Sequence, residues 1–310
     1  MTDVTTTAPA DEPEVDETET ERATPLWQRL VSGSSAPIGL ILVALIVVFS
    51  LIDSSAFLDI ANARNIATDA AVLLVLATGE TFVIITAGVD LSVGAVLVFS
   101  GVVAAKAKIP PLIVTLGTFG MSLGAALVIT GGIDERSVPF KLVSTIGIGR
   151  AFGQVPWLVV IAFAVAIVFG VVLALTRFGR YTYAVGSNEE AARRAGVAVD
   201  RHLIKVYGLA GTLSGLAGFM SLARFATTTI GGHDTDNLSA IAAVVIGGTS
   251  LFGGIGTILG TVFGVFIPAV LTNGFIIAGV QPFWQEIAVG AVLIGAVYLD
   301  QLRRRSQYRR

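Results

Sequence analysis

The chain has no cysteine, few histidines and little charge. Its 310 residues include no Cys and two His, and 14% of them are charged, against about 25% in ordinary soluble domains. The absence of Cys excludes disulfide bonds and thiolate metal sites. One histidine, His233, lies with two Asp in a Gly-rich run that is more typical of a solvated turn than of a metal site. We therefore predict no bound metal.

Signatures of nucleotide hydrolysis and of catalysis are also missing. None of the four lysines between the apolar runs lies in the pattern GxxxxGK[ST], so the chain has no P-loop. We also find no arrangement of a nucleophile with a base and an acid. We expect no cofactor, no catalysis by this chain and no nucleic-acid partner. Any ATP hydrolysis that drives its activity would occur on another polypeptide.

Long hydrophobic runs dominate the rest of the sequence. The hydrophobic content is 54% and the mean hydropathy is +0.82. Repeated runs of about 20 apolar residues indicate membrane-spanning helices. We predict an all-α polytopic membrane protein with about nine transmembrane helices in a membrane domain over residues 37–300. The predicted spans are Pro37–Ile52, Ala67–Ala87, Leu91–Ala105, Leu112–Thr130, Trp157–Leu175, Leu203–Leu222, Ala240–Thr249, Thr257–Leu271 and Phe283–Leu299.

The two ends of the chain are polar and opposite in charge. The first 21 residues hold eight acidic residues and no basic one. We expect residues 1–36 to form a disordered acidic tail followed by a short segment at the lipid interface around Trp27. The start is not a secretory signal, because it lacks basic residues and an apolar core. Residues 301–310 are basic, which predicts a cytoplasmic tail.

A polar segment separates two membrane-length runs in the middle of the chain. It reads GRYTYAVGSNEEAARRAGV, Gly179–Val197, and with its flanks it carries six basic and three acidic residues. Short loops rich in Arg and Lys stay in the cytoplasm. Ser187 or Asn188 can cap a helix that ends at Gly196. The segment is either a solvated loop that orients the protein or a docking element for a cytoplasmic partner.

This segment resembles the coupling loop of permease subunits of ABC-type sugar importers, the ribose/xylose/galactoside class. Three more motifs follow the order of that family: TFVIITAGVDLSVGA (Thr81–Ala95), PPLIVTLGT (Pro110–Thr118) and AIAAVVIGGTSLFGGIGTILGT (Ala240–Thr261). The resemblance implies a multi-pass protein of the cell inner membrane. It also implies an ABC ATPase subunit, an extracytoplasmic sugar-binding protein and a second permease subunit, as a homodimer, as partners.

In that family the loop fits a cleft on the ATP-hydrolysing subunit. The resemblance therefore assigns contact with the ATPase to the middle of the polar segment. The residues concerned are Gly186, Ser187, Asn188, Glu189, Glu190, Ala191, Ala192, Arg193, Arg194 and Gly196.

Several polar residues at membrane depth are candidates for a transport path. Glu80 lies inside an apolar run, where an ionisable group is a functional-site hypothesis. It can equally be a hydrogen-bonded residue packed in the bundle, and family members usually have an uncharged residue there. Gly88 and Val89 break the helix, and broken helices often line transport paths. The path candidates are Glu80, Thr86, Asp90, Ser92, Thr249 and Ser250.

Three glycines spaced by four, Gly256, Gly260 and Gly264, predict one small-residue helix face that allows close helix packing in lipid. The run GGTSLFGG, Gly247–Gly254, predicts an irregular turn between two spans. That turn serves either tight packing or the substrate.

The chain departs from the family before Pro110. Related permeases have one more span between the GVDLSVG helix and the PPLIVTLG helix, and here Lys106 is followed almost directly by Pro110. A crossing takes about 20 residues, so we hypothesise that one span is missing. Five runs before the Arg-rich segment would put the N-terminal tail on the opposite side from it. Either Leu91–Ala105 fails to cross, or the N-terminus faces outward.

Three other functions remain open at this point. One is an importer of branched-chain amino acids or another small solute. Another is an ion-coupled secondary transporter with Glu80 as the proton carrier. The last is a non-transporting membrane scaffold that uses the acidic tail.

Overall fold

The computed structural model describes residues 35–90, 111–134, 136–227 and 236–281, together with single positions up to 298. Several predicted features lie outside these residues: the acidic tail and its interfacial segment, the predicted span Leu91–Ala105 with Ser92, His233, and the basic tail.

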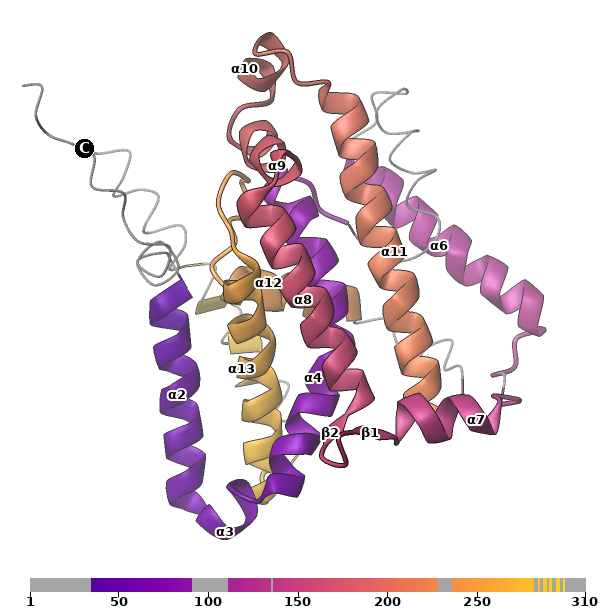
Figure 1. Ribbon diagram of the computed structural model, residues 1–310, viewed down its shortest axis with the longest axis vertical. Helices are drawn as coiled ribbons and strands as arrows, with labels where there is room; N and C mark the ends of the chain where they lie inside the picture. Colours follow the sequence, from indigo (N-terminus) through magenta and orange to yellow (C-terminus); the bar gives the residue numbers. More distant parts are fainter. Residues whose placement is uncertain are drawn as a thin grey trace, which may run out of the picture. The chain divides into compact units, whose positions relative to one another are not determined.

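The described chain is almost entirely helical (Figure 1), as the hydrophobic runs predict. A two-stranded ribbon is the exception within the described residues. The elements are α2 (Ser35–Ile52), α3 (Ser54–Phe57), α4 (Ile60–Ile85), α6 (Pro111–Thr130), α7 (Phe140–Leu142), the π-helix η1 (Val143–Gly147), β1 (Arg150–Ala151), β2 (Val155–Pro156), α8 (Trp157–Leu175), α9 (Arg177–Ser187), α10 (Glu189–Arg194), α11 (Val199–Phe225), α12 (Asp236–Ile246) and α13 (Ile258–Ile277).

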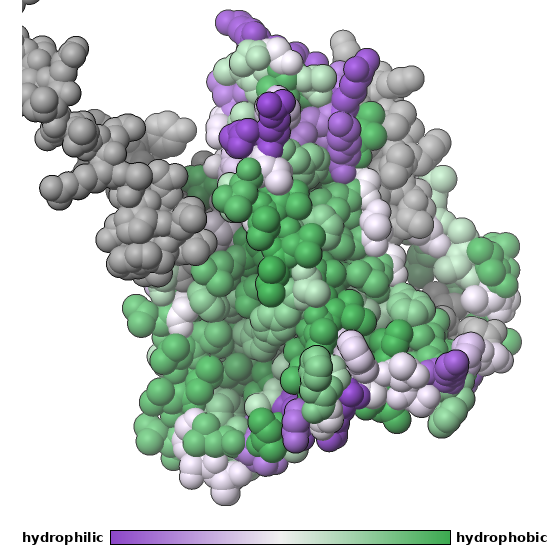
Figure 2. Space-filling model, viewed as in Figure 1, coloured by the Kyte–Doolittle hydropathy of each residue, from purple (hydrophilic) through white to green (hydrophobic). Residues whose placement is uncertain are grey.

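Four of the described helices, α4, α8, α11 and α13, are long and apolar enough to cross a membrane. Three further apolar helices, α2, α6 and α12, are shorter over their described residues. Hydrophobic side chains cover the middle of the helices, and hydrophilic ones gather near α10 and at the opposite end of the bundle (Figure 2). The prediction of an all-α polytopic membrane protein is confirmed.

Helix α4 forms the centre of the bundle. Its second half is buried almost throughout, and its apolar residues share one core cluster with α8, α11, α12 and α13. The hydroxyls of Thr81 and Thr261, both fully buried, lie 2.6 Å apart and join α4 to α13. Hydrogen-bonded threonines of this kind let two helices approach closely in lipid.

The contacts along the helices fix which ends lie together. Arg224, in the last turn of α11, contacts the Asp69 carboxylate and donates to the Thr68 carbonyl in the first half of α4. The two helices are therefore antiparallel. The last residue of α4, Ile85, lies beside Gly186 just before α10. We call this the α10 end of the bundle and the other the far end.

Helix α2 runs parallel to α13, which begins at the α10 end. Gly39 near the start of α2 faces the ring of Phe263, and Phe49 near its end packs against Phe275. The first residue of α2 therefore lies at the α10 end.

Asp90 and Phe140 lie toward opposite ends of the bundle. Asp90 follows α4 at the α10 end, whereas η1 lies at the far end, where Gly147 contacts the Ala223 carbonyl of α11. Helix α6 lies within this interval and slopes toward α7 at the far end (Figure 1).

Candidate functional site

The short helix α10 projects from one end of the bundle. Asn188 is its N-cap, since its Oδ1 accepts a hydrogen bond of 2.9 Å from the Ala191 N–H. Glu189 and Glu190 occupy the first turn, where the helix dipole favours acids, and Arg193 and Arg194 occupy the last. The acids and bases of the motif therefore complement the helix dipole at both ends.

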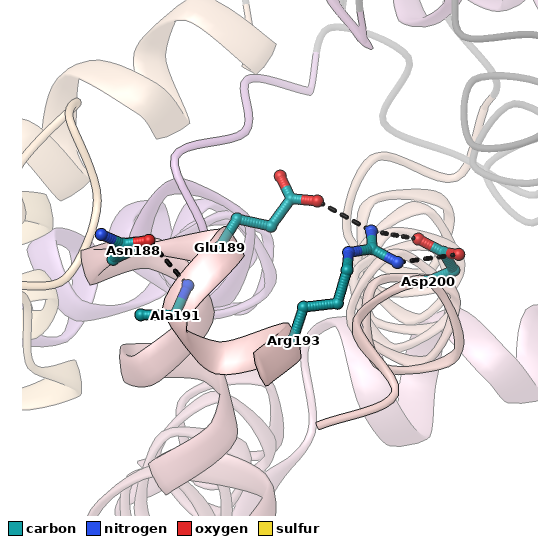
Figure 3. Close-up of polar contacts among 5 residues, drawn as sticks. All are labelled: Asn188, Glu189, Ala191, Arg193 and Asp200. Atoms are coloured by element: carbon teal, nitrogen blue, oxygen red, sulfur yellow. Dashed lines mark hydrogen bonds and ion pairs between the residues drawn. The ribbon is translucent and has the colours of Figure 1, made fainter. Parts of the chain in front are cut away.

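Arg193 ties α10 to the beginning of α11 (Figure 3). Its guanidinium donates to Glu189 at 2.9 Å and to the two carboxylate oxygens of Asp200 at 2.8 and 3.3 Å. The hydrogen bonds that Arg193 donates to Asp200 and to Glu189, the first having the larger effect, raise the pKa of Arg193 further, so its charge is permanent. All three side chains are about half exposed. Because exposed ion pairs contribute little stability, this network orients α10 more than it stabilises the protein.

A small apolar contact with α9 and α11 holds α10 in place. Ala192 is buried against Val185 of α9 and Val199 of α11. Gly196 then turns the chain with φ of +85°, a conformation that favours glycine. The charged side chains of α10 stay exposed, as the hydrophilic patch around it in Figure 2 shows.

Helix α9 precedes α10, and hydropathy alone does not reveal it. The predicted coupling residues Gly186 and Ser187 belong to its last turn, not to α10. Thr182 of α9 lies 3.0 Å from the ring of His202 in α11, with both side chains buried. The available signal in RFGRYTYAVGS was the spacing by three of Gly179, Thr182 and Val185, which places them on the buried face of an amphipathic helix.

Glu80 and Asp90 are both buried near the α10 end. Glu80 is 3% exposed and Asp90 is fully buried, and the two carboxyl groups interact electrostatically. Glu80 Oε2 has no hydrogen-bond partner among the described residues. The Tyr207 hydroxyl of α11 lies so close to Gly88 that a Cβ there would stand 2.5 Å from it. Within the described ranges no three His, Cys, Asp or Glu side chains gather to hold a metal ion.

The other described path candidates lie at the α10 end. Thr86, Thr249 and Ser250 are buried. Thr86 follows α4 directly, and its hydroxyl donates to the Val83 carbonyl at 2.7 Å. The other two lie in the turn that joins α12 to α13, close to the end of α9. The structure thus places these hydroxyls beneath α10.

Two of the three predicted packing glycines lie on one helix face. A Cβ on Gly260 would overlap the Gly247 carbonyl oxygen, and one on Gly264 would overlap that of Ala243. Both positions bring α13 against the backbone of α12. Including Gly256 in this helix face was wrong. Thr257 caps α13 by accepting from the Gly260 N–H, so Gly256 lies in the preceding turn.

The chain is similar to several bacterial sugar import permeases. It is 36% identical to the ribose import permease protein RbsC of Bacillus subtilis, covering 83% of this chain and 89% of the relative. It is 32% identical to the fructose import permease protein FrcC of Rhizobium meliloti, covering 90% and 88%. It is 33% identical to the D-allose transport system permease protein AlsC of Escherichia coli, covering 84% and 90%.

Each of these alignments has more positions than there are aligned residues of this chain. The alignment with RbsC runs over 292 positions, whereas 83% of the 310 residues is about 257, so about 35 positions face a gap in this chain. With FrcC the alignment has 320 positions and 90% of the chain is about 279, which leaves about 41. Both differences exceed the roughly 20 residues of one crossing.

No solved structure matches this chain significantly. The family model described as the permease component of branched-chain amino acid transport systems matches residues 99–297. This match covers more than half of the chain, and the relatives share at least 32% identity over most of it. The chain therefore belongs to the family of branched-chain amino acid transport system permease components, and it is a homologue of bacterial sugar import permeases.

Proposed function

We propose that this protein is the membrane-spanning subunit of an ATP-driven importer of a monosaccharide in the cell inner membrane. The observation that carries the proposal is helix α10, a capped, charged and exposed helix held by Arg193 and Ala192 at one end of the bundle. A helix that is exposed and yet held in place is suited to bind another protein. The similarity to ribose, fructose and allose permeases supports a sugar as the solute.

The proposal assigns a different partner to each end of the bundle. A separate ABC ATPase subunit binds α10 and hydrolyses ATP, since the chain itself has no P-loop. An extracytoplasmic sugar-binding protein delivers the sugar at the far end. A second copy of this chain completes the pathway.

The buried Glu80 favours a second candidate, an ion-coupled transporter. The energy source of uptake distinguishes the two candidates. In vesicles that contain the permease, its ATPase and its binding protein, we expect vanadate to abolish uptake of labelled ribose, fructose or allose. A protonophore should leave the initial rate unchanged. Uptake that the protonophore stops and vanadate spares would overturn the proposal. Accumulation of leucine instead of any of the three sugars would favour a branched-chain amino acid importer.

The variant Glu80→Gln sharpens this test. The amide keeps the size and hydrogen-bonding capacity of Glu80 and removes only its titratable proton, so we expect a rate within about twofold of the unaltered protein. Loss of a pH-dependent uptake rate in this variant would instead make Glu80 a proton carrier.

We also propose that this chain makes one crossing between Asp90 and Phe140, where related permeases make more. The short interval before Pro110 supports this, and the number of gap positions in the alignments is large enough for a missing crossing. Gly117, Gly120 and Gly124 of α6 support it further, because no described residue lies within 4 Å of the Cβ positions there. These glycines form a small-residue face of the kind that packs against a neighbouring helix.

Reporter fusions test this topology. Fusions after Ser34, Ala107 and Arg310 should all report the cytoplasm, and a fusion after Gly132 should report the outside. An extracytoplasmic signal after Ala107 would mean that residues 91–107 cross the membrane, and it would overturn the single-crossing proposal.

A further inference from the structure

Three segments that are far apart in the sequence meet directly beneath α10. They are the last turn of α9, the last turn of α4 and the turn between α12 and α13. The Gly254 N–H donates to the Ile85 carbonyl at 2.8 Å. A Cβ on Gly186 would overlap that same carbonyl oxygen, and one on Gly253 would stand 2.7 Å from the Gly186 oxygen. The three backbones therefore touch with no side chain between them. We call this contact the glycine junction.

A tyrosine hydroxyl closes the junction on one side. Tyr183 of α9 donates to the Gly256 carbonyl at 2.6 Å. Partial burial raises the pKa of Tyr183 to about 12, so the hydroxyl is protonated and donates at any physiological pH. Gly256 in turn packs against Ile85 and Thr249, so this hydrogen bond joins α9 to the same turn that contacts α4.

The upper side of the junction is continuous with α10. Gly186 lies two residues before the N-cap Asn188, whose N–H donates to the Ala184 carbonyl of α9 at 3.1 Å. Ala192 of α10 is buried against Val185 of α9. Because the last turn of α9 and the first turn of α10 share these contacts, a displacement of α10 moves Gly186 with it.

The lower side of the junction is the helix break that leads to the buried acids. Ile85 is the last residue of α4. Two residues further along the chain, Ala87 has a backbone φ of +61° and lies close to Gly253. Gly88 then packs against the Tyr207 hydroxyl, and the next polar side chain is Asp90. Strained backbone of this kind persists only where its surroundings hold it. Here the junction and Tyr207 hold it.

We infer that the glycine junction carries the movement of α10 to the break after α4, and that Tyr183 and Gly186 are positioning residues for transport. This inference rests on the proposed function. The competing route from α10 to α11 consists of the exposed ion pair of Arg193 with Asp200, which contributes little, and one small buried contact of Ala192 with Val199. The junction consists of buried backbone contacts, and close-packed interiors transmit displacements because they are stiff.

The test measures how much sugar is transported per ATP hydrolysed. The permease, its ATPase and its binding protein are reconstituted in liposomes with whichever of ribose, fructose or allose the unaltered complex accumulates. Tyr183→Phe removes one hydroxyl and keeps the ring. We expect it to capture the ATPase normally and to hydrolyse ATP, while the ratio of sugar to ATP falls about fivefold, the equilibrium effect of one buried hydrogen bond.

Gly186→Ala forces the Ile85 carbonyl away and should lower the ratio of sugar to ATP to background. Gly215→Ala is the matched control, because nothing in the described part of the chain lies within 4 Å of its Cβ position in α11, and its ratio should not change. A merely structural defect would lower transport and ATP hydrolysis together and leave the ratio intact. An unchanged ratio in Tyr183→Phe would overturn the inference and leave the proposed function standing. Failure of the unaltered chain to bind any ABC ATPase would overturn both.

Discussion

Replacing Glu189 with arginine is expected to lower sugar uptake more than about 100-fold, since like charges brought together at an interface cost several kcal/mol. The substitution reverses an exposed charge in the first turn of α10 and places a third basic side chain beside Arg193. The variant should remain in the membrane, because exposed ion pairs contribute at most about 1 kcal/mol to stability. The measurement is capture of the ATPase subunit by the tagged permease, followed by uptake in vesicles. Gly196→Trp, which adds a bulky side chain at φ of +85°, should have the same effect.

Asp59→Arg is the control for the reversal of charge. Asp59 is exposed at the start of α4, at the far end of the bundle, and its side chain makes no capping hydrogen bond. This variant should capture the ATPase as well as the unaltered protein does. Normal capture by Glu189→Arg as well would show that α10 is a solvated loop and that the ATPase docks elsewhere.

Gly260→Leu should produce the largest loss of stability. Any side chain at this position overlaps the Gly247 carbonyl, so α12 and α13 must separate where Thr81 and Thr261 also meet. Overpacking of a buried site costs about 1–3 kcal/mol. We expect the melting temperature in detergent to fall by roughly 5 °C or more.

Gly215→Leu provides the comparison, because position 215 is exposed in α11 with open space around it. A substitution at Gly279 would be a less suitable comparison, since the backbone φ of +71° at this position would strain any side chain. Equal melting temperatures for Gly260→Leu and Gly215→Leu would mean that the glycine spacing in α13 is coincidental.

Hydropathy predicted the apolar membrane-spanning segments better than the polar segments that extend beyond them. The span Trp157–Leu175 was predicted with both bounds correct, because Pro156 and Thr176 border a purely apolar run. Helix α4 begins at Ile60, seven residues before the predicted start at Ala67. Its first turns carry Asn62 and Arg64, which are polar and therefore look like a loop. These side chains bond to the Phe57 carbonyl and to Gln154, contacts that a hydropathy profile does not contain.

The sequence motifs showed which segments matter but not that they meet. Each of the three segments of the glycine junction lies within a motif quoted from the sequence. Their meeting depends on the antiparallel order of α4 and α11 and on the turn after α12, which are tertiary facts. The same holds for Glu80. Its burial follows from an apolar run, whereas its proximity to Asp90 depends on how the chain folds back after Ala87.

The far end of the bundle and the glycine junction are held by different kinds of contact, and this should give them different kinetics. At the far end the links join polar side chains: Arg224 with Asp69, Asn273 with Asn62 at 2.8 Å, and Arg64 with Gln154. Water and dissolved ions can replace such partners one at a time, and salt shortens the range of the charged ones. At the α10 end, glycine backbones touch directly, and no solvent molecule can substitute for a missing part of that surface. Separation at the far end should therefore proceed in small steps that ionic strength accelerates, whereas separation of the glycine junction should be a single event that ionic strength leaves unchanged.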